Sequence, residues 1–228
     1  MSSTYNIAID GPAGAGKSTI AKLVAAKLGF IYVDTGAMYR AMALYFLENG
    51  IQPEDEEKVS TTCGQIDISL RYQDGVQQVI LNGRDVSGKI RTEAVGNAAS
   101  VVSAYRAVRQ ALLALQQNLA KTSNVIMDGR DIGTCVLPHA QTKIYLTASS
   151  HVRAIRRYKE LTEKGQMCNL EEIEQDIIER DHRDMTRETA PLKQAEDAVL
   201  LDSSEMTLEQ VVQAIIDTAK ARGLKEEA

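Results

Sequence analysis

The sequence has few cysteines, and they form no pattern. The three cysteines, Cys63, Cys135 and Cys168, are widely spaced and contain no CxxC pair. This spacing excludes a disulfide framework and indicates no zinc site. We therefore expect a protein of the reducing cytoplasm.

Long apolar runs are also missing. No stretch reaches the roughly 18 uninterrupted apolar residues that a membrane span requires. The first residues, MSSTYNIAIDGPAG, lack the basic start and following apolar run that are typical of an export signal. We expect a soluble, unexported protein with no membrane partner.

The chain has no excess of basic residues. Lys and Arg number 26 against 31 Asp and Glu, which gives a net charge of −5. Such a protein has no overall attraction for a polyanion, so a nucleic acid polymer is not an expected partner. The length of 228 residues suits one α/β domain that carries a small insertion.

Short apolar runs alternate with helical patterns along the chain. The pattern predicts strands at residues 5–10, 31–33, 125–127, 143–146 and 198–201, and clear helices at residues 17–28 and 37–48. Alternating β and α elements predict an α/β fold with a five-stranded parallel sheet and helices on both faces. Ligands then bind in the loops at the carboxyl ends of the strands.

One stretch breaks this alternation. Residues 66–72 and 76–81 have the alternating pattern of two strands around a turn at Asp74-Gly75, and Asn82-Gly83 predicts a second tight turn. We expect a small β insertion here.

A glycine-rich motif predicts the phosphate donor. Residues 11–18 read GPAGAGKS, an unbroken match to GxxxxGK[ST] between a predicted strand and a predicted helix. Glycines let backbone N–H groups surround a phosphate, and the lysine reaches the outer phosphate oxygens. An incidental glycine-rich turn is the weaker alternative. The predicted ATP-binding residues of this P-loop are Gly11, Pro12, Ala13, Gly14, Ala15, Gly16, Lys17, Ser18 and Thr19.

Two oxygen donors are candidates for Mg²⁺. The hydroxyl of Ser18 is one, and the carboxylate of Asp128, which closes the apolar run VIMD, is the other. A cap at the end of a strand is an equally good interpretation of Asp128.

The arginines predict a phosphorylated acceptor. Two approaching phosphates must be neutralised, and guanidinium groups do this bidentately. In ERDHRDMTR, Arg180, Asp184 and Arg187 fall at i, i+4 and i+7, so a helix would place them on one face. By itself such a run is more typical of a solvated charged face.

Further arginines follow other strands. Arg40 lies in DTGAMYR after the second strand, and Arg130 lies beside Asp131 in DGRD after the third. Since these loops share one edge of the sheet, the segments are expected to converge on a phosphate-rich site. Arg153, Arg156 and Arg157 form another group, which is either a lid over ATP or an ordinary basic helix face.

Five segments together resemble the bacterial cytidylate kinase family. They are, in order, GPAGAGKS, DTGAMYR, NAASVVSAYRAVR, DGRDIGT and ERDHRDMTR, and they span nearly the whole chain. The β insertion followed by VSGKIRTE is similar to that family's extended region for binding nucleoside monophosphates. The resemblance implies transfer of the γ-phosphoryl group from ATP, as MgATP, to CMP or dCMP.

The resemblance also implies roles for residues. Ser100, Arg109 and Asp131 would read the cytosine edge, and Arg180 and Asp184 would hold the pentose or its phosphate. The implied substrate-binding residues are Thr35, Arg40, Ser100, Arg109, Arg130, Asp131, Arg180, Asp184 and Arg187. The implied catalytic residues are Lys17, Arg130, Arg180 and Arg187, and Arg157 is the implied lid contact to ATP.

The same resemblance divides the single domain into regions. The core comprises residues 1–34, 122–150 and 195–228, the acceptor-binding region with its insertion comprises residues 35–121, and a helical lid comprises residues 151–190.

A shared pocket for Ser100 and Arg109 requires a broken helix. These residues are nine positions apart, so on one straight helix, at about 100° per residue, they would face opposite ways. We expect the break at Ala104-Tyr105.

Alternative functions remain open on the sequence. The acceptor could be another nucleoside monophosphate, such as UMP or AMP, or a small phosphorylated metabolite. A regulatory nucleotide switch predicts an NKxD motif, which the sequence lacks. We expect a monomer.

Overall fold

A parallel five-stranded sheet forms the centre of the protein. The computed structural model describes residues 4–73 and 76–225. The sheet has the strand order β2-β6-β1-β7-β8, and every pair of neighbours is parallel. Its strands are β1 Asn6–Asp10, β2 Ile31–Asp34, β6 Val125–Gly129, β7 Thr142–Thr147 and β8 Val199–Asp202. The predicted parallel sheet and all five of its strands are confirmed.

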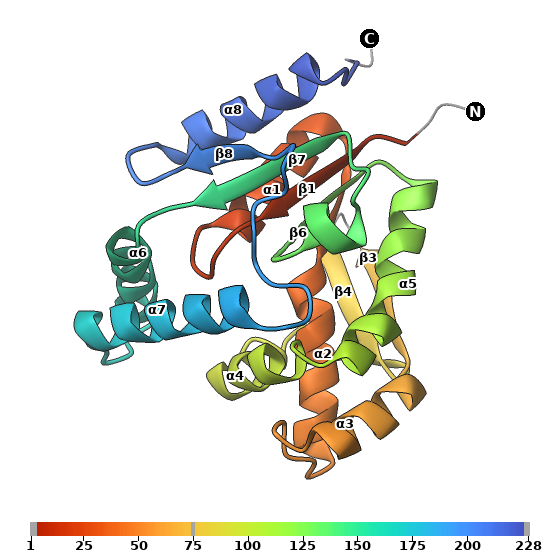
Figure 1. Ribbon diagram of the computed structural model, residues 1–228. Coiled ribbons are helices and arrows are strands. Elements are labelled where there is room, and N and C mark those ends of the chain that lie inside the picture. The colour runs from red at the N-terminus through yellow and green to blue at the C-terminus, as the bar shows by residue number, and fades with distance from the viewer. Residues whose placement is uncertain (1–3, 74–75, 226–228) are drawn as a thin grey trace.

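Helices cover both faces of this sheet, as predicted. Successive side chains of a strand point to opposite faces, so Ile7 and Ile9 pack in one apolar core with α1 and α8, whereas Ala8 belongs to the other. Helix α2 lies on that second face, where α4 and α5 pack against it (Figure 1). The helices are α1 Lys17–Leu28, α2 Thr35–Glu48, α3 Glu56–Thr62, α4 Glu93–Val102, α5 Arg106–Thr122, α6 Ser150–Glu163, α7 Leu170–Thr186 and α8 Leu208–Ala221.

The predicted β insertion is a small antiparallel sheet. It consists of β3 Ile68–Gln73, β4 Val76–Leu81 and β5 Arg84–Asp85. Asn82 and Gly83 both have positive φ, 47° and 80°, which is the backbone of a tight hairpin turn. The second predicted turn is thus confirmed, whereas the first, at Asp74-Gly75, lies outside the described residues.

The helix that carries Ser100 and Arg109 is broken where it was expected to be. Helix α4 ends at Val102 and α5 begins at Arg106. Tyr105 is extended, with φ −80° and ψ 129°, and redirects the chain between them. The predicted break at Ala104-Tyr105 is confirmed.

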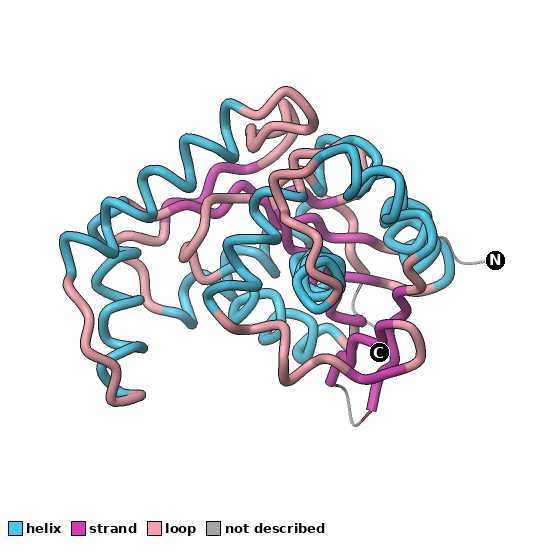
Figure 2. The backbone as a smooth tube through the Cα atoms, turned by 90° about the horizontal axis from the view of Figure 1, so that it is seen from below, coloured by secondary structure: helices cyan, strands magenta, loops and turns pink. Residues whose placement is uncertain are grey.

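Two helices form a separate layer at one end of the molecule. Helices α6 and α7 contact each other and lie opposite the small sheet in both views (Figures 1 and 2). Within the described residues, no helix has both the length and the apolar character that a membrane span requires.

Candidate active site

Gly11, the first residue after β1, cannot be replaced by another residue without a shift of the backbone. Gly11 has φ 151°, and a Cβ built on it would lie 1.9 Å from the carbonyl oxygen of Leu146. Gly16 has φ 82° and forms the N-cap of α1. Left-handed backbone of this kind is available to glycine at little cost. The glycines of the motif therefore set the path of the loop.

The N-terminus of α1 is prepared for an anion. Gly16 provides no side-chain cap, and the first turn contains no acidic residue, so the exposed N–H groups and the helix dipole favour a phosphate. Lys17 lies beside them, buried, and its Nζ donates a hydrogen bond to the Pro12 carbonyl at 2.6 Å. Burial, with the nearby charge of Arg130, lowers the pKa of the Lys17 ammonium.

Asp128 connects the P-loop to the second strand. Its Oδ2 accepts a hydrogen bond from Ser18 Oγ at 2.8 Å, and its Oδ1 accepts one from Tyr32 Oη at 2.9 Å. Burial, and next the charge of Asp34, raises the pKa of Asp128. The contact from Tyr32 was not anticipated, because it depends on β2 and β6 being neighbours.

The Ser18 hydroxyl and the Asp128 carboxylate fit Mg²⁺, which prefers hard oxygen ligands and retains several waters or phosphate oxygens. Across the described residues, no group of three or more His, Cys, Asp or Glu side chains could hold a metal ion. The pair therefore suits an ion that arrives with nucleotide phosphates.

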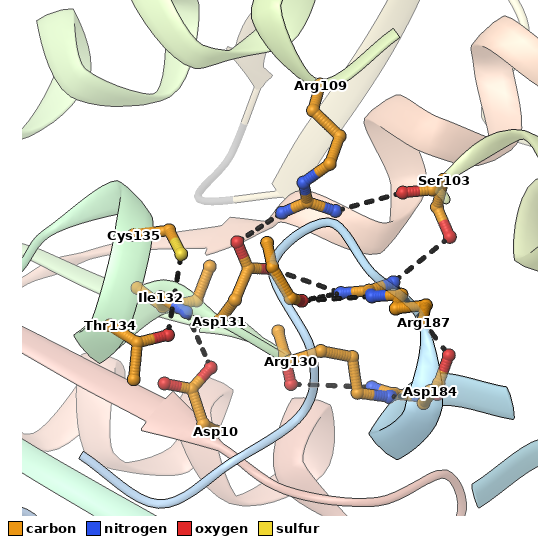
Figure 3. Close-up of polar contacts among 12 residues, drawn as sticks. Asp10, Ser103, Arg109, Arg130, Asp131, Ile132, Thr134, Cys135, Asp184 and Arg187 are labelled. Atoms are coloured by element: carbon orange, nitrogen blue, oxygen red, sulfur yellow. Dashed lines mark hydrogen bonds and ion pairs between the residues drawn. The ribbon is translucent and has the colours of Figure 1, made fainter. Parts of the chain in front are cut away.

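A buried cluster surrounds Asp131. Arg109 Nη2 donates a hydrogen bond to Asp131 Oδ2, and Arg187 Nη2 lies 3.6 Å from Asp131 Oδ1 (Figure 3). Arg109 Nη1 donates to the backbone carbonyl of Ser103, and Arg187 Nη1 donates to the hydroxyl of the same residue. The structure thus brings together three predicted site residues, and adds Ser103, which only the helix break places there.

Arg130 and Asp184 form a second pair in the same site. Arg130 Nε donates a hydrogen bond to Asp184 Oδ2 at 2.8 Å. Burial opposes ionisation of Asp184, but the charges of Arg130, Arg187 and Arg180 outweigh it and hold its pKa below the usual value. Asp184 is therefore a carboxylate among several guanidinium groups.

Arg180 is the least satisfied of these arginines. Its Nε is buried without a hydrogen-bond partner among the described residues. Burial, followed by repulsion from Arg130, lowers its pKa to about 10. A buried guanidinium N–H without an acceptor is costly, so this position favours an anionic ligand.

Arg187 lies one residue past the helix that the sequence predicted for it, and its Nη1 is 3.9 Å from Asp184 Oδ1. Helix α7 ends at Thr186, and Arg187 is its C-cap in an extended conformation, with φ −61° and ψ 142°. Its Nε and Nη2 both donate to the Ala190 carbonyl. The side chain therefore joins the Asp131 cluster through the turn after the helix, and not through the i, i+7 spacing.

Arg40 and Thr35 lie at the start of α2. Arg40 Nη2 donates to Asp34 Oδ2 at 2.9 Å, while Arg40 Nε is buried with no partner among the described residues. The Thr35 hydroxyl donates to the backbone carbonyl of Asp128 at 2.7 Å. Thr35 thus holds two strand ends together, and its contact with a substrate stays a prediction.

Ser100 is half-buried on α4, and its backbone carbonyl accepts a hydrogen bond from Ser103 Oγ at 3.0 Å. The break after Val102 removes the geometric objection to a pocket shared with Arg109. That shared pocket stays a prediction.

Asp10 is a site residue that the sequence analysis missed. It precedes the P-loop, and its carboxylate accepts a hydrogen bond from the backbone N–H of Ile132 at 2.7 Å (Figure 3). It accepts a second one from the backbone N–H of Gly133, also at 2.7 Å. Burial raises its pKa to about 6, against the lowering effect of these two bonds. Asp10 therefore ties the P-loop strand to the loop that carries Asp131.

The arginines of α6 separate in the structure. Arg153 is buried, and its Nη1 donates to the Ala13 carbonyl of the P-loop at 2.8 Å. Arg156 instead donates to Ser203. The implied ATP contact, Arg157, lies on the surface, where its Nη1 donates to Glu160 at 2.9 Å. Arg153 therefore contacts the P-loop, and the contact of Arg157 with ATP stays a prediction.

The chain is similar to known proteins over nearly its whole length. Residues 7–221 match the family model described as Cytidylate kinase. Over 212 residues the chain is 52% identical to a cytidylate kinase of Caldicellulosiruptor bescii, and this covers 93% of the chain and 94% of that protein. Over 220 residues it is 46% identical to a cytidylate kinase of Shouchella clausii, which covers 96% and 98% of the two chains. The matched range includes both the P-loop and the Asp131 cluster.

Proposed function

This chain belongs to the cytidylate kinase family, and we propose that it transfers the γ-phosphoryl group of ATP to CMP or dCMP, giving ADP and CDP or dCDP. The observation that carries the proposal is the buried cluster in which Asp131 lies between Arg109 and Arg187. Cytosine offers an amino donor beside acceptor atoms, which a carboxylate and a guanidinium complement. Uracil has a carbonyl oxygen in place of that amino group, so it would present an acceptor to the carboxylate and bind less well.

The donor phosphates bind the P-loop and Lys17. Lys17 Nζ, which donates to the Pro12 carbonyl in the structure, turns to the β and γ oxygens when ATP is bound. The open N-terminus of α1 stabilises the same negative charge.

Ser18 and Asp128 hold Mg²⁺ of the MgATP complex. When it is bound, the ion neutralises negative charge on the ATP phosphates. The support is the 2.8 Å contact between the Ser18 hydroxyl and the Asp128 carboxylate, which brings two oxygen ligands to the first turn of α1.

The acceptor side supplies charge neutralisation and alignment. Arg40, Arg130 and Arg187 neutralise the phosphates, and Arg180 with Asp184 holds the pentose or its phosphate. The oxygen of the acceptor phosphate is already a nucleophile. This oxygen forms a bond to the γ-phosphorus while the bond to the leaving ADP oxygen breaks. No protein base is required, and the catalytic contribution is orientation with electrostatic stabilisation.

We assign the regions of the chain accordingly. Residues 1–34, 122–150 and 195–228 form the core, residues 35–121 bind the acceptor, and residues 151–190 form a lid that excludes water. The protein acts as a monomer in the cytoplasm, where its three free cysteines would stay reduced.

The test is a coupled assay of ADP formation with ATP and Mg²⁺, in which CMP, dCMP, UMP, AMP, GMP and TMP are offered in parallel at equal concentration. Rates dominated by CMP and dCMP are expected. Comparable rates with UMP or AMP would favour a kinase of another monophosphate. ADP formation that is indifferent to every acceptor would contradict a kinase of nucleoside monophosphates.

A further inference from the structure

One arginine near the site belongs to no group described so far. Arg91 lies in the segment after the β insertion, just before Thr92, the N-cap of α4. Its Nη2 donates a hydrogen bond to Asp34 Oδ2 at 3.2 Å, although 61% of its side chain is exposed. Arg91 therefore reaches from the insertion to the carboxyl end of β2.

The carboxylate that it reaches is shared. Asp34 Oδ2 also accepts the hydrogen bond from Arg40 Nη2, at 2.9 Å, while Asp34 Oδ1 caps α2 by accepting from the backbone N–H of Ala37. The Asp34 side chain is only 7% exposed. One buried carboxylate thus faces two guanidinium groups, and the local excess of positive charge favours another anion.

The insertion is fixed to this same strand end. The Gln77 side chain of β4 accepts a hydrogen bond from the backbone N–H of Asp34 at 2.9 Å and donates one to the carbonyl of Asp34 at 3.3 Å. Tyr72 of β3 donates to the neighbouring carbonyl of Tyr32 at 3.2 Å. These contacts hold the insertion against the end of β2, so the segment with Arg91 lies beside the site.

We propose that Arg91 is a further ligand of the acceptor phosphate, and that Asp34 holds the guanidinium groups of Arg91 and Arg40 until that phosphate replaces the carboxylate. The inference rests on the proposed function, since it requires a phosphorylated acceptor. It gives the β insertion a role in binding: the insertion supplies an arginine that the core of the sheet does not contain.

The exchange is favourable for physical reasons. A phosphate dianion offers more charge and more acceptor oxygens than a carboxylate, and guanidinium groups match it in a bidentate manner. An ion pair as exposed as that of Arg91 contributes little to stability, so its release costs little. The unpartnered Nε of Arg40 supplies another donor for the same phosphate.

The test compares Arg91→Gln with Arg84→Gln. Arg84 is a matched control because it also belongs to the insertion and forms an ion pair with a carboxylate of α2, that of Glu48 at the other end of the helix. The KM for CMP is measured at saturating MgATP, and the KM for ATP at saturating CMP. Cytidine, which lacks the phosphate, is tested as a competitive inhibitor.

Arg91→Gln is expected to raise the KM for CMP about tenfold or more, since one charge-assisted contact is lost. Its KM for ATP and its inhibition constant for cytidine should change less than about twofold, and Arg84→Gln should leave all three constants within that range. Arg91→Lys should restore part of the affinity for CMP.

Two results would overturn the inference. One is a KM for CMP that stays within about twofold of the native value in Arg91→Gln. The other is an equal weakening of CMP and cytidine, which would indicate a displaced insertion. A native protein that phosphorylates no nucleoside monophosphate would instead refute the proposed function, and the role of Arg91 with it.

Discussion

Replacing Arg153 by methionine should destabilise the protein strongly, although the residue lies in the predicted lid. Its Nε donates to the Ala148 carbonyl at 2.9 Å, its Nη1 donates to the Ala13 carbonyl at 2.8 Å, and its Nη2 lies 2.6 Å from Asp181 Oδ2. Asp181 Oδ1 in turn accepts from the backbone N–H of Ala13 at 3.4 Å. The Arg153–Asp181 ion pair therefore binds both the N–H and the carbonyl of Ala13 in the P-loop.

The magnitude follows from burial. The side chains of Arg153 and Asp181 are 6% and 12% exposed, so Arg153→Met leaves a carboxylate with little access to water. Breaking such a pair on one side costs about 3–5 kcal/mol in the free energy of unfolding. For a chain of this length that corresponds to a fall of roughly 6–20 °C in Tm. The KM for ATP should also rise, because the Ala13 carbonyl loses its donor.

Arg157→Met is the matched control on the same helix. The Arg157 side chain is 45% exposed and pairs with Glu160, and such pairs contribute at most about 1 kcal/mol. Urea unfolding gives the stability of each variant, and a steady-state assay gives the KM for ATP.

A destabilisation of Arg153→Met below about 1 kcal/mol would refute this reasoning. A raised KM for ATP in Arg157→Met at unchanged stability would support the ATP contact implied for that residue.

Three further predictions concern the site. Burial raises the pKa of Asp10 from 3.8 to about 6. Between these two pH values the folded state binds more protons at Asp10 than the unfolded state does. The stability that Asp10 contributes therefore falls as the pH rises through this range. From about pH 4.5 to about pH 7.5 the native protein should therefore lose about 2 kcal/mol relative to Asp10→Asn, measured by urea unfolding; parallel pH profiles would contradict this. Gly11→Ala should cost at least about 3 kcal/mol, because the new Cβ would lie 1.9 Å from a backbone oxygen of β7, whereas Gly88→Ala, which meets no atom within 4 Å, should be tolerated in the same thermal melt. Asp131→Asn should lower the ratio of kcat/KM for CMP over UMP by about tenfold or more, because the carboxylate that accepts from the cytosine amino group is lost; an unchanged ratio would remove Asp131 from base recognition.

Local features of the sequence predicted much of the fold. The strands of the large sheet, the P-loop, α1 and the Asn82-Gly83 turn each depend on a few adjacent residues, whose apolar pattern or backbone freedom is visible in the sequence. The break near Ala104 was expected only from the resemblance, which puts Ser100 and Arg109 in one pocket, because residues nine positions apart face opposite ways on a straight helix.

Predictions that depended on element ends were less accurate. Arg187 was expected within α7, but the helix stops at Thr186 and the side chain turns toward Asp131 from an extended residue. Helix termini depend on contacts made by the surrounding structure, which a charge pattern does not contain.

The sequence by itself determined which chemical groups the protein has, and in which order: a phosphate-binding loop, arginines after several strands, and a β insertion between them. Only the tertiary structure decided which residues of the chain contact one another in the site. Asp10 meets Ile132 because β1 and β6 are neighbours, and Arg153 meets Ala13 because α6 lies against the P-loop. These pairings join residues more than a hundred positions apart, so they follow from strand order and helix packing, which local sequence patterns do not encode.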